Sequence, residues 1–164
     1  MQKIMYRVGI GFDAHRFSKE RKLILGGVEI PFELGLKGHS DADVLTHAIC
    51  DAILGAIGER DIGSHFPDSD PRYKGVSSLI LLNQVIALSN SRGFKIENID
   101  SILVCERPRL SQYISQMKER LSLVTQVSED SLCIKATTTD TMGFTGRGEG
   151  IAAYAVVLVK RVSI

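Results

Sequence analysis

The sequence predicts an α/β (α+β) fold with a mixed sheet and helices packed on one face. Segments of alternating apolar residues are separated by segments of helical period, and no repeat or Pro-, Gly- or Ser-rich linker divides the chain. With 164 residues, 44% of them hydrophobic and 24% charged, the chain suits one globular domain over residues 1–164. No pattern indicates what covers the other sheet face, so we expect an oligomer to bury it.

The first part of the chain predicts a strand, a hairpin and a helix. Residue types alternate over residues 6–12, as in a strand, and Gly26-Gly27 interrupts an apolar run in the manner of a short hairpin. Ser40 is the expected N-cap of a helix that ends near Gly58. Residues 61–74 contain two prolines and several aspartates, which predicts a loop, and a loop of this length is more often functional than incidental.

The rest of the chain alternates between helical and extended patterns. Helices are expected over residues 76–92, where Gly93 ends the helix, and near residues 114–124. Strands are expected over residues 94–105, 132–138 and 151–162.

Composition excludes several classes of function. The net charge of +1 gives no reason to expect nucleic-acid or membrane binding. Residues 1–12 lack the apolar core of a secretory signal, and the longest apolar run, residues 151–159, is far shorter than the ~20 residues of a membrane span. Three cysteines without a CxxC pair argue against a disulfide framework. We therefore expect a soluble, cytoplasmic protein.

A candidate metal site is divided between a strand and a helix. On a strand, Asp13 and His15 project to the same face. On the helix, a polar stripe with a spacing of four, without Lys, Arg or Glu, consists of Asp43, His47 and Asp51. One histidine of this stripe and the Asp-x-His pair form a set that binds Zn²⁺ with one position left open. Asp51 would then either orient one of these ligands or form a salt bridge. The competing interpretation is that these residues are solvated polar side chains without a metal.

Three further segments are candidates for binding a polyanion. The helix start at Ser40 would attract phosphate, but Asp41 and Asp43 would repel it unless a cation bridges the charges. The acidic loop over residues 61–71 suits a polyol or a metal-bound diphosphate as well as a solvated turn. Residues 135–150 combine hydroxyls, a carboxylate, glycines and an arginine without a P-loop or Rossmann pattern, so a phosphate–Mg²⁺ loop and a glycine hairpin are equally favoured.

Four long motifs cover nearly the whole chain. They are GIGFDAHRF at residues 9–17, GLKGHSDADVLTHAICDAILGA at 35–56, GERDIGSHFPDSDPRYKG at 58–75 and KATTTDTMGFTGRGEGIAAYAV at 135–156. Together and in this order they resemble the 2-C-methyl-D-erythritol 2,4-cyclodiphosphate synthase family of the non-mevalonate isoprenoid pathway.

The resemblance implies a homotrimer with active sites between neighbouring subunits. It implies Zn²⁺, or another divalent transition metal, at Asp13, His15 and His47, and transition-state stabilisation by His39 and Thr138. Residues expected to hold the methylerythritol and phosphate groups are Asp13, His15, His39, Ser40, Asp61, Ile62, Gly63, Phe66, Pro67, Asp68, Ser69 and Asp70. Residues expected around the cytidine diphosphate are Cys105, Glu106, Arg107, Pro108, Arg109, Leu110, Ser111, Thr137, Thr138, Thr139, Asp140, Phe144 and Arg147.

The resemblance also implies a second ion, Mg²⁺ or Mn²⁺, that bridges the substrate diphosphate. Its candidate ligand is Asp140, where the family commonly has the longer Glu, so coordination through water is expected. Cys105 and Arg109 stand where Ala and Lys are more usual, which would change the cytosine pocket in detail but not in role.

The implied reaction is an intramolecular phosphoryl transfer catalysed by a phosphorus–oxygen lyase. In 4-diphosphocytidyl-2-C-methyl-D-erythritol 2-phosphate, the 2-phosphate attacks the β-phosphorus, CMP leaves and the cyclic diphosphate forms. Two alternatives stay open at this point: a metal-dependent phosphohydrolase that activates water, and a non-catalytic trimeric nucleotide-binding module with a structural metal.

Overall fold

A five-stranded mixed sheet forms the centre of the fold. The computed structural model describes residues 5–162 of the chain. The strands are β1 (Tyr6–Ser18), β4 (Gly35–Leu36), β5 (Phe94–Val104), β6 (Leu132–Thr137) and β7 (Gly150–Arg161), and their spatial order is β4-β1-β7-β5-β6. β5 and β6 run parallel, whereas the other neighbouring pairs are antiparallel, so the prediction of a mixed sheet is confirmed.

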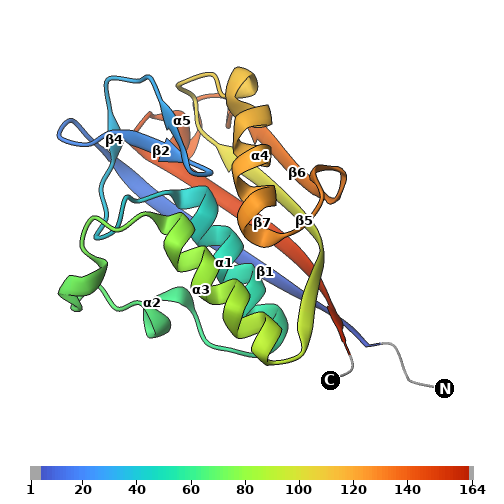
Figure 1. Cartoon of the computed structure of the whole chain (residues 1–164). Helices are drawn as coiled ribbons and strands as arrows, with labels where there is room; N and C mark the ends of the chain where they lie inside the picture. Colours follow the sequence, from blue (N-terminus) through green and yellow to red (C-terminus); the bar gives the residue numbers. More distant parts are fainter. Residues whose placement is uncertain (1–4, 163–164) are drawn as a thin grey trace.

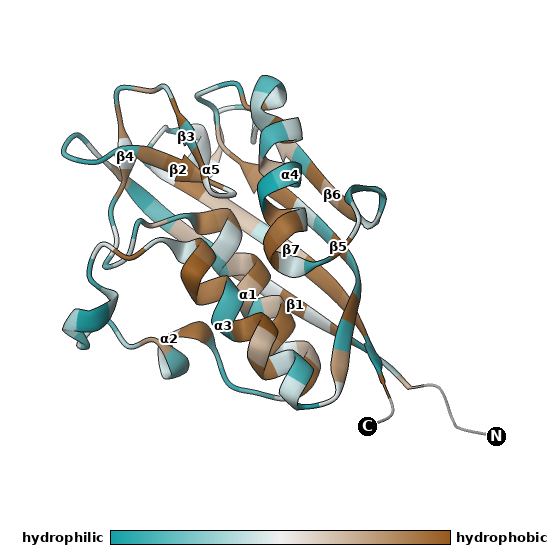
Figure 2. Ribbon diagram, viewed as in Figure 1, coloured by the Kyte–Doolittle hydropathy of each residue, from teal (hydrophilic) through white to brown (hydrophobic). Residues whose placement is uncertain are grey.

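Three long helices lie on the same side of this sheet (Figure 1). They are α1 (Val44–Ile57), α3 (Ser78–Ser91) and α4 (Ile114–Thr125). The short elements are β2 (Leu23–Leu25), β3 (Val28–Ile30), α2 (Ile62–His65), α5 (Gly143–Gly146) and the 3-10 turns Pro71–Tyr73, Ser111–Tyr113 and Glu129–Ser131. In Figure 2, α1 and α3 are largely brown, as expected for helices whose apolar residues fill the core, whereas the loop around Pro71–Tyr73 is largely teal.

The contact between β1 and α1 is unusually close because β1 presents glycines to the helix. A Cβ atom added to Gly11 would lie 1.9 Å from the carbonyl oxygen of Ala48, and one added to Gly9 would lie 1.9 Å from that of Ala52. The strand backbone therefore rests directly on the helix backbone. Beyond these glycines, the same side of β1 carries the polar residues Asp13 and His15 toward the helix.

The apolar residues of β1 consequently point to the opposite face. Val8 and Ile10 are 65% and 71% exposed, and the ring of Phe12 packs against that of Tyr154 on β7, tilted by 47° with centroids 4.8 Å apart. Val156 lies opposite Ile10 in the strand register and is also exposed. This face of the sheet is a contiguous apolar stripe, as expected for a surface that becomes covered in an assembly.

Most predicted elements are confirmed, with three differences. Ser40 is not the N-cap of α1, since the helix begins after Asp43, which accepts a hydrogen bond from the N–H of Thr46. The predicted loop over residues 61–74 contains α2 and the Pro71–Tyr73 turn. Residues 143–150, for which a glycine hairpin was one of two alternatives, begin with α5.

The described part of the chain also bears on two predictions about targeting. Residues 1–4, part of the segment predicted to lack a secretory signal, lie outside the described residues. Within residues 5–162, no helix has both the length and the hydropathy needed to cross a bilayer.

Candidate metal centre and active site

Three side chains from β1 and α1 converge on one point. The Oδ2 atom of Asp13 lies 2.9 Å from Nε2 of His15 and 3.0 Å from Nδ1 of His47, and the two imidazole nitrogens are 3.2 Å apart. In the described part of the chain this is the one group of at least three His, Cys, Asp or Glu side chains with the geometry to hold a metal ion. The structure thus brings together the three residues that the sequence selected.

The remaining ring nitrogens have partners that orient both imidazoles. Nδ1 of His15 donates to the carbonyl oxygen of Lys37 at 2.8 Å, which leaves Nε2 directed at the cluster. Nε2 of His47 faces the hydroxyls of Ser78 at 2.8 Å and Ser40 at 3.0 Å, on the far side of the ring from Asp13. Hydrogen bonds of this kind hold metal-binding histidines in position.

The electrostatics of the cluster favour ionised Asp13. Burial opposes the charge, but hydrogen bonds from His15 and His47 and their positive charge hold the pKa of Asp13 well below its usual range. Burial lowers the pKa of His15, and its hydrogen bond and charge interaction with Asp13 more than offset this, so the net pKa is raised. The site therefore offers an anionic carboxylate oxygen between two imidazole nitrogens.

These donors fit a divalent transition-metal ion. Tetrahedral zinc with ligand bonds of about 2.0–2.1 Å requires ligand atoms about 3.3 Å apart. The observed separations of 2.9, 3.0 and 3.2 Å differ from this by only a few tenths of an ångström. Three protein ligands leave one position for a substrate oxygen, which is typical of catalytic rather than structural sites.

Asp43 and Asp51, the other members of the predicted polar stripe, do not join the cluster. Asp43 is fully buried and accepts hydrogen bonds from the backbone of Gly26, Gly27 and Thr46 and from the Thr46 hydroxyl. Its assignment to a stripe facing the site is wrong, because it lies before the first helical turn and caps it. Asp51 accepts the N–H of Ile62 at 2.7 Å, so it holds the start of α2, and with residues 5–162 it forms neither predicted interaction.

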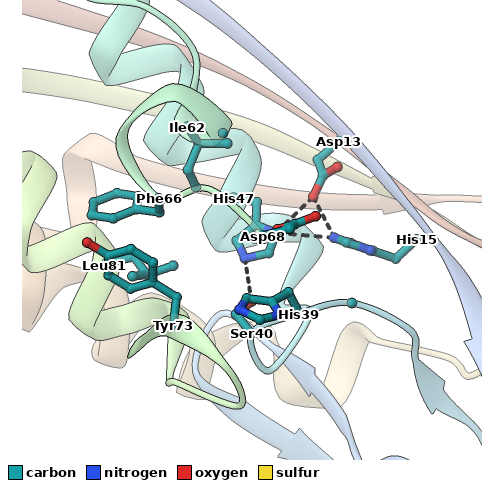
Figure 3. A pocket seen from close by; sticks show the side chains of 12 residues that line it. Asp13, His15, His39, Ser40, His47, Ile62, Phe66, Asp68, Tyr73 and Leu81 are labelled. Carbon is teal, nitrogen blue, oxygen red and sulfur yellow. Dashed lines mark hydrogen bonds and ion pairs between the residues drawn. The ribbon is translucent and has the colours of Figure 1, made fainter. Parts of the chain in front are cut away.

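A cavity of about 230 Å³ lies beside the metal cluster. Figure 3 shows Asp13, His15 and His47 pointing toward one another on one side, with Ile62, Phe66, Tyr73 and Leu81 gathered on the other. The lining residues are Asp13, His15, Gly38, His39, Ser40, His47, Ile62, Gly63, Phe66, Asp68, Tyr73 and Leu81. One wall is therefore polar and the opposite wall is apolar.

The remaining predicted residues of the acidic loop lie around this cavity without lining it. Asp61 caps α2 through Ser64, and Asp70 is paired with Arg72. The backbone carbonyl of Asp70 accepts a hydrogen bond from Nε2 of His39 at 2.9 Å, which fixes that ring at the cavity mouth. Pro67 and Ser69 occupy the same loop.

A second cavity lies where β5 and β6 end. It measures about 380 Å³ and is lined by Cys105, Glu106, Pro108, Arg109, Leu110, Ser111, Ala136, Thr137 and Thr138. Parallel strands end at the same sheet edge, which is why these two distant segments meet. Among residues 5–162, none lines both this cavity and the metal cavity.

The last predicted residues follow β6. The carboxylate of Glu106 accepts the N–H of Thr139, which ties the two segments together. Thr139 and Phe144 line a third cavity on the apolar sheet face, next to Phe12 and Tyr154. Two charged residues are exposed, Asp140 with a positive φ of 50° and Arg147 with a hydrogen bond to Glu149. Arg107 lies between residues that line the second cavity.

Sequence reasoning missed several residues of the metal cavity. Tyr73 and Leu81 line its apolar wall, and Ser78 contacts His47. Ser78 and Leu81 belong to a helix with a generic amphipathic pattern, so no sequence signal distinguishes them from core residues. Tyr73 could have been selected, because it is an aromatic residue inside a polar motif.

Comparisons with known proteins match the chain over nearly its full length. The model of the YgbB family covers residues 6–160. A 2-C-methyl-D-erythritol 2,4-cyclodiphosphate synthase of Geotalea uraniireducens is 57% identical over 155 residues, which are 94% of this chain and 99% of that protein.

Solved structures show the same similarity in three dimensions. The bifunctional IspDF from Campylobacter jejuni has a TM-score of 0.94 and 39% identity, over 98% of this chain and 44% of that longer chain. The CDP complex of IspF from Plasmodium falciparum has a TM-score of 0.84 and 30% identity, over 96% of this chain and 97% of that chain.

Proposed function

The chain belongs to the YgbB family, and from this membership we propose that it converts 4-diphosphocytidyl-2-C-methyl-D-erythritol 2-phosphate to 2-C-methyl-D-erythritol 2,4-cyclodiphosphate and CMP. It is then a phosphorus–oxygen lyase of isoprenoid precursor synthesis. The observation that supports this function best is the convergence of Asp13, His15 and His47 beside a half-polar, half-apolar cavity, in a chain 57% identical to a protein named for that activity.

The two cavities divide the substrate between them. Pockets that enclose a small organic ligand usually measure about 300–1,000 Å³. The metal cavity, at about 230 Å³, is too small for the whole substrate. We place the methylerythritol 2-phosphate there, with its carbon skeleton against Phe66 and Leu81, and the cytidine end in the second cavity. The CDP complex of the Plasmodium falciparum relative supports a nucleotide ligand of this kind.

The chemistry requires positioning and charge compensation and no protein nucleophile. An oxygen of the 2-phosphate forms a bond to the β-phosphorus, the bond from the β-phosphorus to the bridging oxygen breaks, and CMP leaves with that oxygen and its electron pair. When bound at Asp13, His15 and His47, Zn²⁺ or another divalent transition metal supplies positive charge near the reacting phosphates. Good orientation of two groups in one molecule contributes up to about 7–11 kcal/mol.

This chain's own residues orient the reacting groups. His39 donates its Nε2–H to the carbonyl of Asp70, so Nδ1 of the neutral ring can accept a hydrogen bond from a substrate hydroxyl. We assign His39 and Thr138 to stabilisation of the transition state. We assign Asp140 to Mg²⁺ or Mn²⁺ on the diphosphate, because it is an exposed carboxylate that follows the second cavity.

We propose that the enzyme is a homotrimer with sites between subunits. The apolar stripe of β1 and β7 provides a surface for association, and His39 and Thr138, which we expect to act on one substrate, line separate cavities within one chain. Thr138 of one subunit would then complete the metal cavity of its neighbour.

Mixed trimers test this arrangement. When His47→Ala and Thr138→Ala chains are co-expressed in equal amounts, about a quarter of the sites between subunits combine one intact half from each chain. We expect each variant alone to be inactive and the mixture to recover about a quarter of wild-type activity. A mixture as inactive as its components would show that both halves of the site come from one chain.

The reaction itself is tested by ³¹P NMR in water enriched in ¹⁸O. The expected products are CMP and a cyclic diphosphate that contains no solvent oxygen. Incorporation of ¹⁸O with release of a linear phosphate would instead identify a phosphohydrolase. Elemental analysis of the active protein, with and without chelator treatment, identifies the metal.

We also propose a compartment and a domain organisation for the chain. All three cysteines, Cys50, Cys105 and Cys133, are free, which suits a reducing compartment, and we propose the cytoplasm. We treat residues 1–164 as one domain. Fractionation of the source cells and limited proteolysis, respectively, test these two assignments.

A further inference from the structure

Both ring nitrogens of His47 have hydrogen-bonding neighbours, and those of Nε2 lie on the side away from the metal cluster. Nδ1 faces the Oδ2 atom of Asp13 at 3.0 Å, whereas Nε2 faces Oγ of Ser78 at 2.8 Å. A neutral imidazole carries its proton on only one nitrogen. A metal ion that binds Nδ1 replaces any proton there, including one shared with Asp13, so the remaining ring proton must be on Nε2. The neighbours of Nε2 then either accept this proton or oppose it.

Ser78 is the first residue of α3 and is fully buried. Both of its hydrogen-bond donors are directed at one side chain. Its hydroxyl donates to Oδ1 of Asp41, and its backbone N–H donates to Oδ2 of Asp41 at 3.0 Å. The hydroxyl hydrogen is therefore committed to Asp41, and only the lone pairs of Oγ remain to face His47.

This arrangement makes Ser78 an acceptor toward His47. If its hydroxyl were free to rotate, it could donate to Nε2 and favour the ring form with the proton on Nδ1, which cannot bind a metal ion. Ser40, the other hydroxyl near Nε2, accepts the N–H of Ala42 at 3.2 Å, and among the described residues no carboxylate directs its hydrogen. Ser40 can donate or accept, so it does not select the ring form.

We propose that Asp41 and Ser78 are positioning residues that fix the proton of His47 on Nε2 and so keep Nδ1 available to the metal ion. Neither residue lines the metal cavity, and neither belongs to the site residues that the sequence predicted. The inference rests on the proposed metal site and adds the interaction that prepares one of its ligands.

The experiment compares zinc affinity in purified full-length protein and three variants. Ser78→Ala removes the acceptor. Asp41→Asn keeps the shape, but an amide can accept at only one of its two terminal atoms, so it cannot receive both the N–H and the O–H of Ser78. Ser77→Ala is the matched control, because Ser77 precedes Ser78 at the same helix start and its side chain makes no capping hydrogen bond.

The primary measurement is Zn²⁺ affinity by competition with a chromophoric chelator. We expect Ser78→Ala and Asp41→Asn to lose about 10–100-fold in affinity, the range observed when such partners of metal-binding histidines are removed. We expect Ser77→Ala to stay within about twofold of wild type. A second measurement titrates activity with free Zn²⁺, where the midpoint should shift by the same factor and excess zinc should restore turnover.

The outcomes separate this inference from the proposed function. Wild-type affinity in either Ser78→Ala or Asp41→Asn, as a folded protein, would overturn the inference and leave the metal site intact. An equal loss in Ser77→Ala, or turnover that excess zinc does not restore, would also overturn it, because both indicate a general disturbance of α3. A wild-type protein that binds no metal would refute the proposed site itself. The two informative variants alter different elements, so a folded sample of either one decides the question.

Discussion

The close contact of β1 with α1 sets the distance of His47 from Asp13 and His15, and Gly11→Ala tests this dependence. The added Cβ would lie 1.9 Å from the carbonyl oxygen of Ala48 on α1. Ordinary contacts between carbon and carbonyl oxygen are about 3.3–3.6 Å, so the strand and the helix must separate by roughly 1.4 Å or more. Neither backbone can rotate away, since the contact is with main-chain atoms.

The size of this displacement decides the expected effect. The three ligand atoms are only 2.9–3.2 Å apart, and one of them is carried by the helix that must move. Misplacement of a functional group by about 1 Å can reduce function about 100-fold. We therefore expect a loss of zinc affinity of about 100-fold, and a decrease in the free energy of unfolding of about 1–3 kcal/mol from overpacking.

Chelator competition measures the affinity, and urea unfolding of metal-free protein measures the stability. Gly55→Ala is the matched control on the same helix, because its Cβ would meet nothing closer than the carbonyl oxygen of Ile10 at 3.9 Å. It should keep wild-type zinc affinity and gain about 0.5–1 kcal/mol of stability as a helical Gly→Ala change. A Gly11→Ala protein with wild-type affinity and stability would refute the argument.

Three other predictions concern residues outside the metal cluster. Asp43→Ala removes a buried acceptor of four hydrogen bonds and should lower the free energy of unfolding by about 3 kcal/mol or more, measured in urea; a loss below about 1 kcal/mol would contradict its structural role. Asp51→Ala releases the N–H of Ile62 and should raise KM several-fold without changing zinc affinity, so an unchanged KM in steady-state kinetics would count against it. Burial raises the pKa of Cys105 to about 11, so its thiol is neutral at physiological pH and its alkylation should accelerate about tenfold per pH unit between about pH 7 and 10. Mass mapping should find the exposed Cys133 labelled first, and equal labelling of both at neutral pH would be the contrary result.

The sequence predicted the elements well because each is specified locally. Alternation in β1 and helical period in α1 and α3 depend on neighbours within a few residues, and the structure confirms them. The prediction that Ser40 caps α1 was wrong because the choice of cap depends on distant residues. Ser40 and Asp43 are both good capping residues, and the choice depends on the distant backbone of Gly26 and Gly27, which Asp43 also binds.

In the candidate site, too, local spacing identified some residues correctly and failed for others. The spacing of Asp13 and His15 on a strand, and the isolation of His47 on an apolar helix, were enough to select three residues that converge. The same spacing argument failed for Asp43, because equal spacing places residues on one side of a helix only when all of them lie inside it. Asp51 lies inside α1, but its carboxylate accepts a hydrogen bond from the N–H of Ile62 and does not join the cluster.

By itself, the amino-acid order determined which segments are strands and helices, and it selected the chemical groups that can hold a metal ion. Only the tertiary structure decided that Ser78 and Asp41, 37 residues apart, meet beside His47, and that the two halves of the expected site lie in separate cavities. Helix and strand patterns depend on interactions between residues that are close in the sequence, so they can be predicted from it. Contacts between distant segments depend instead on how closely whole elements pack, and at β1 and α1 that distance is set by glycines with no side chain to signal it.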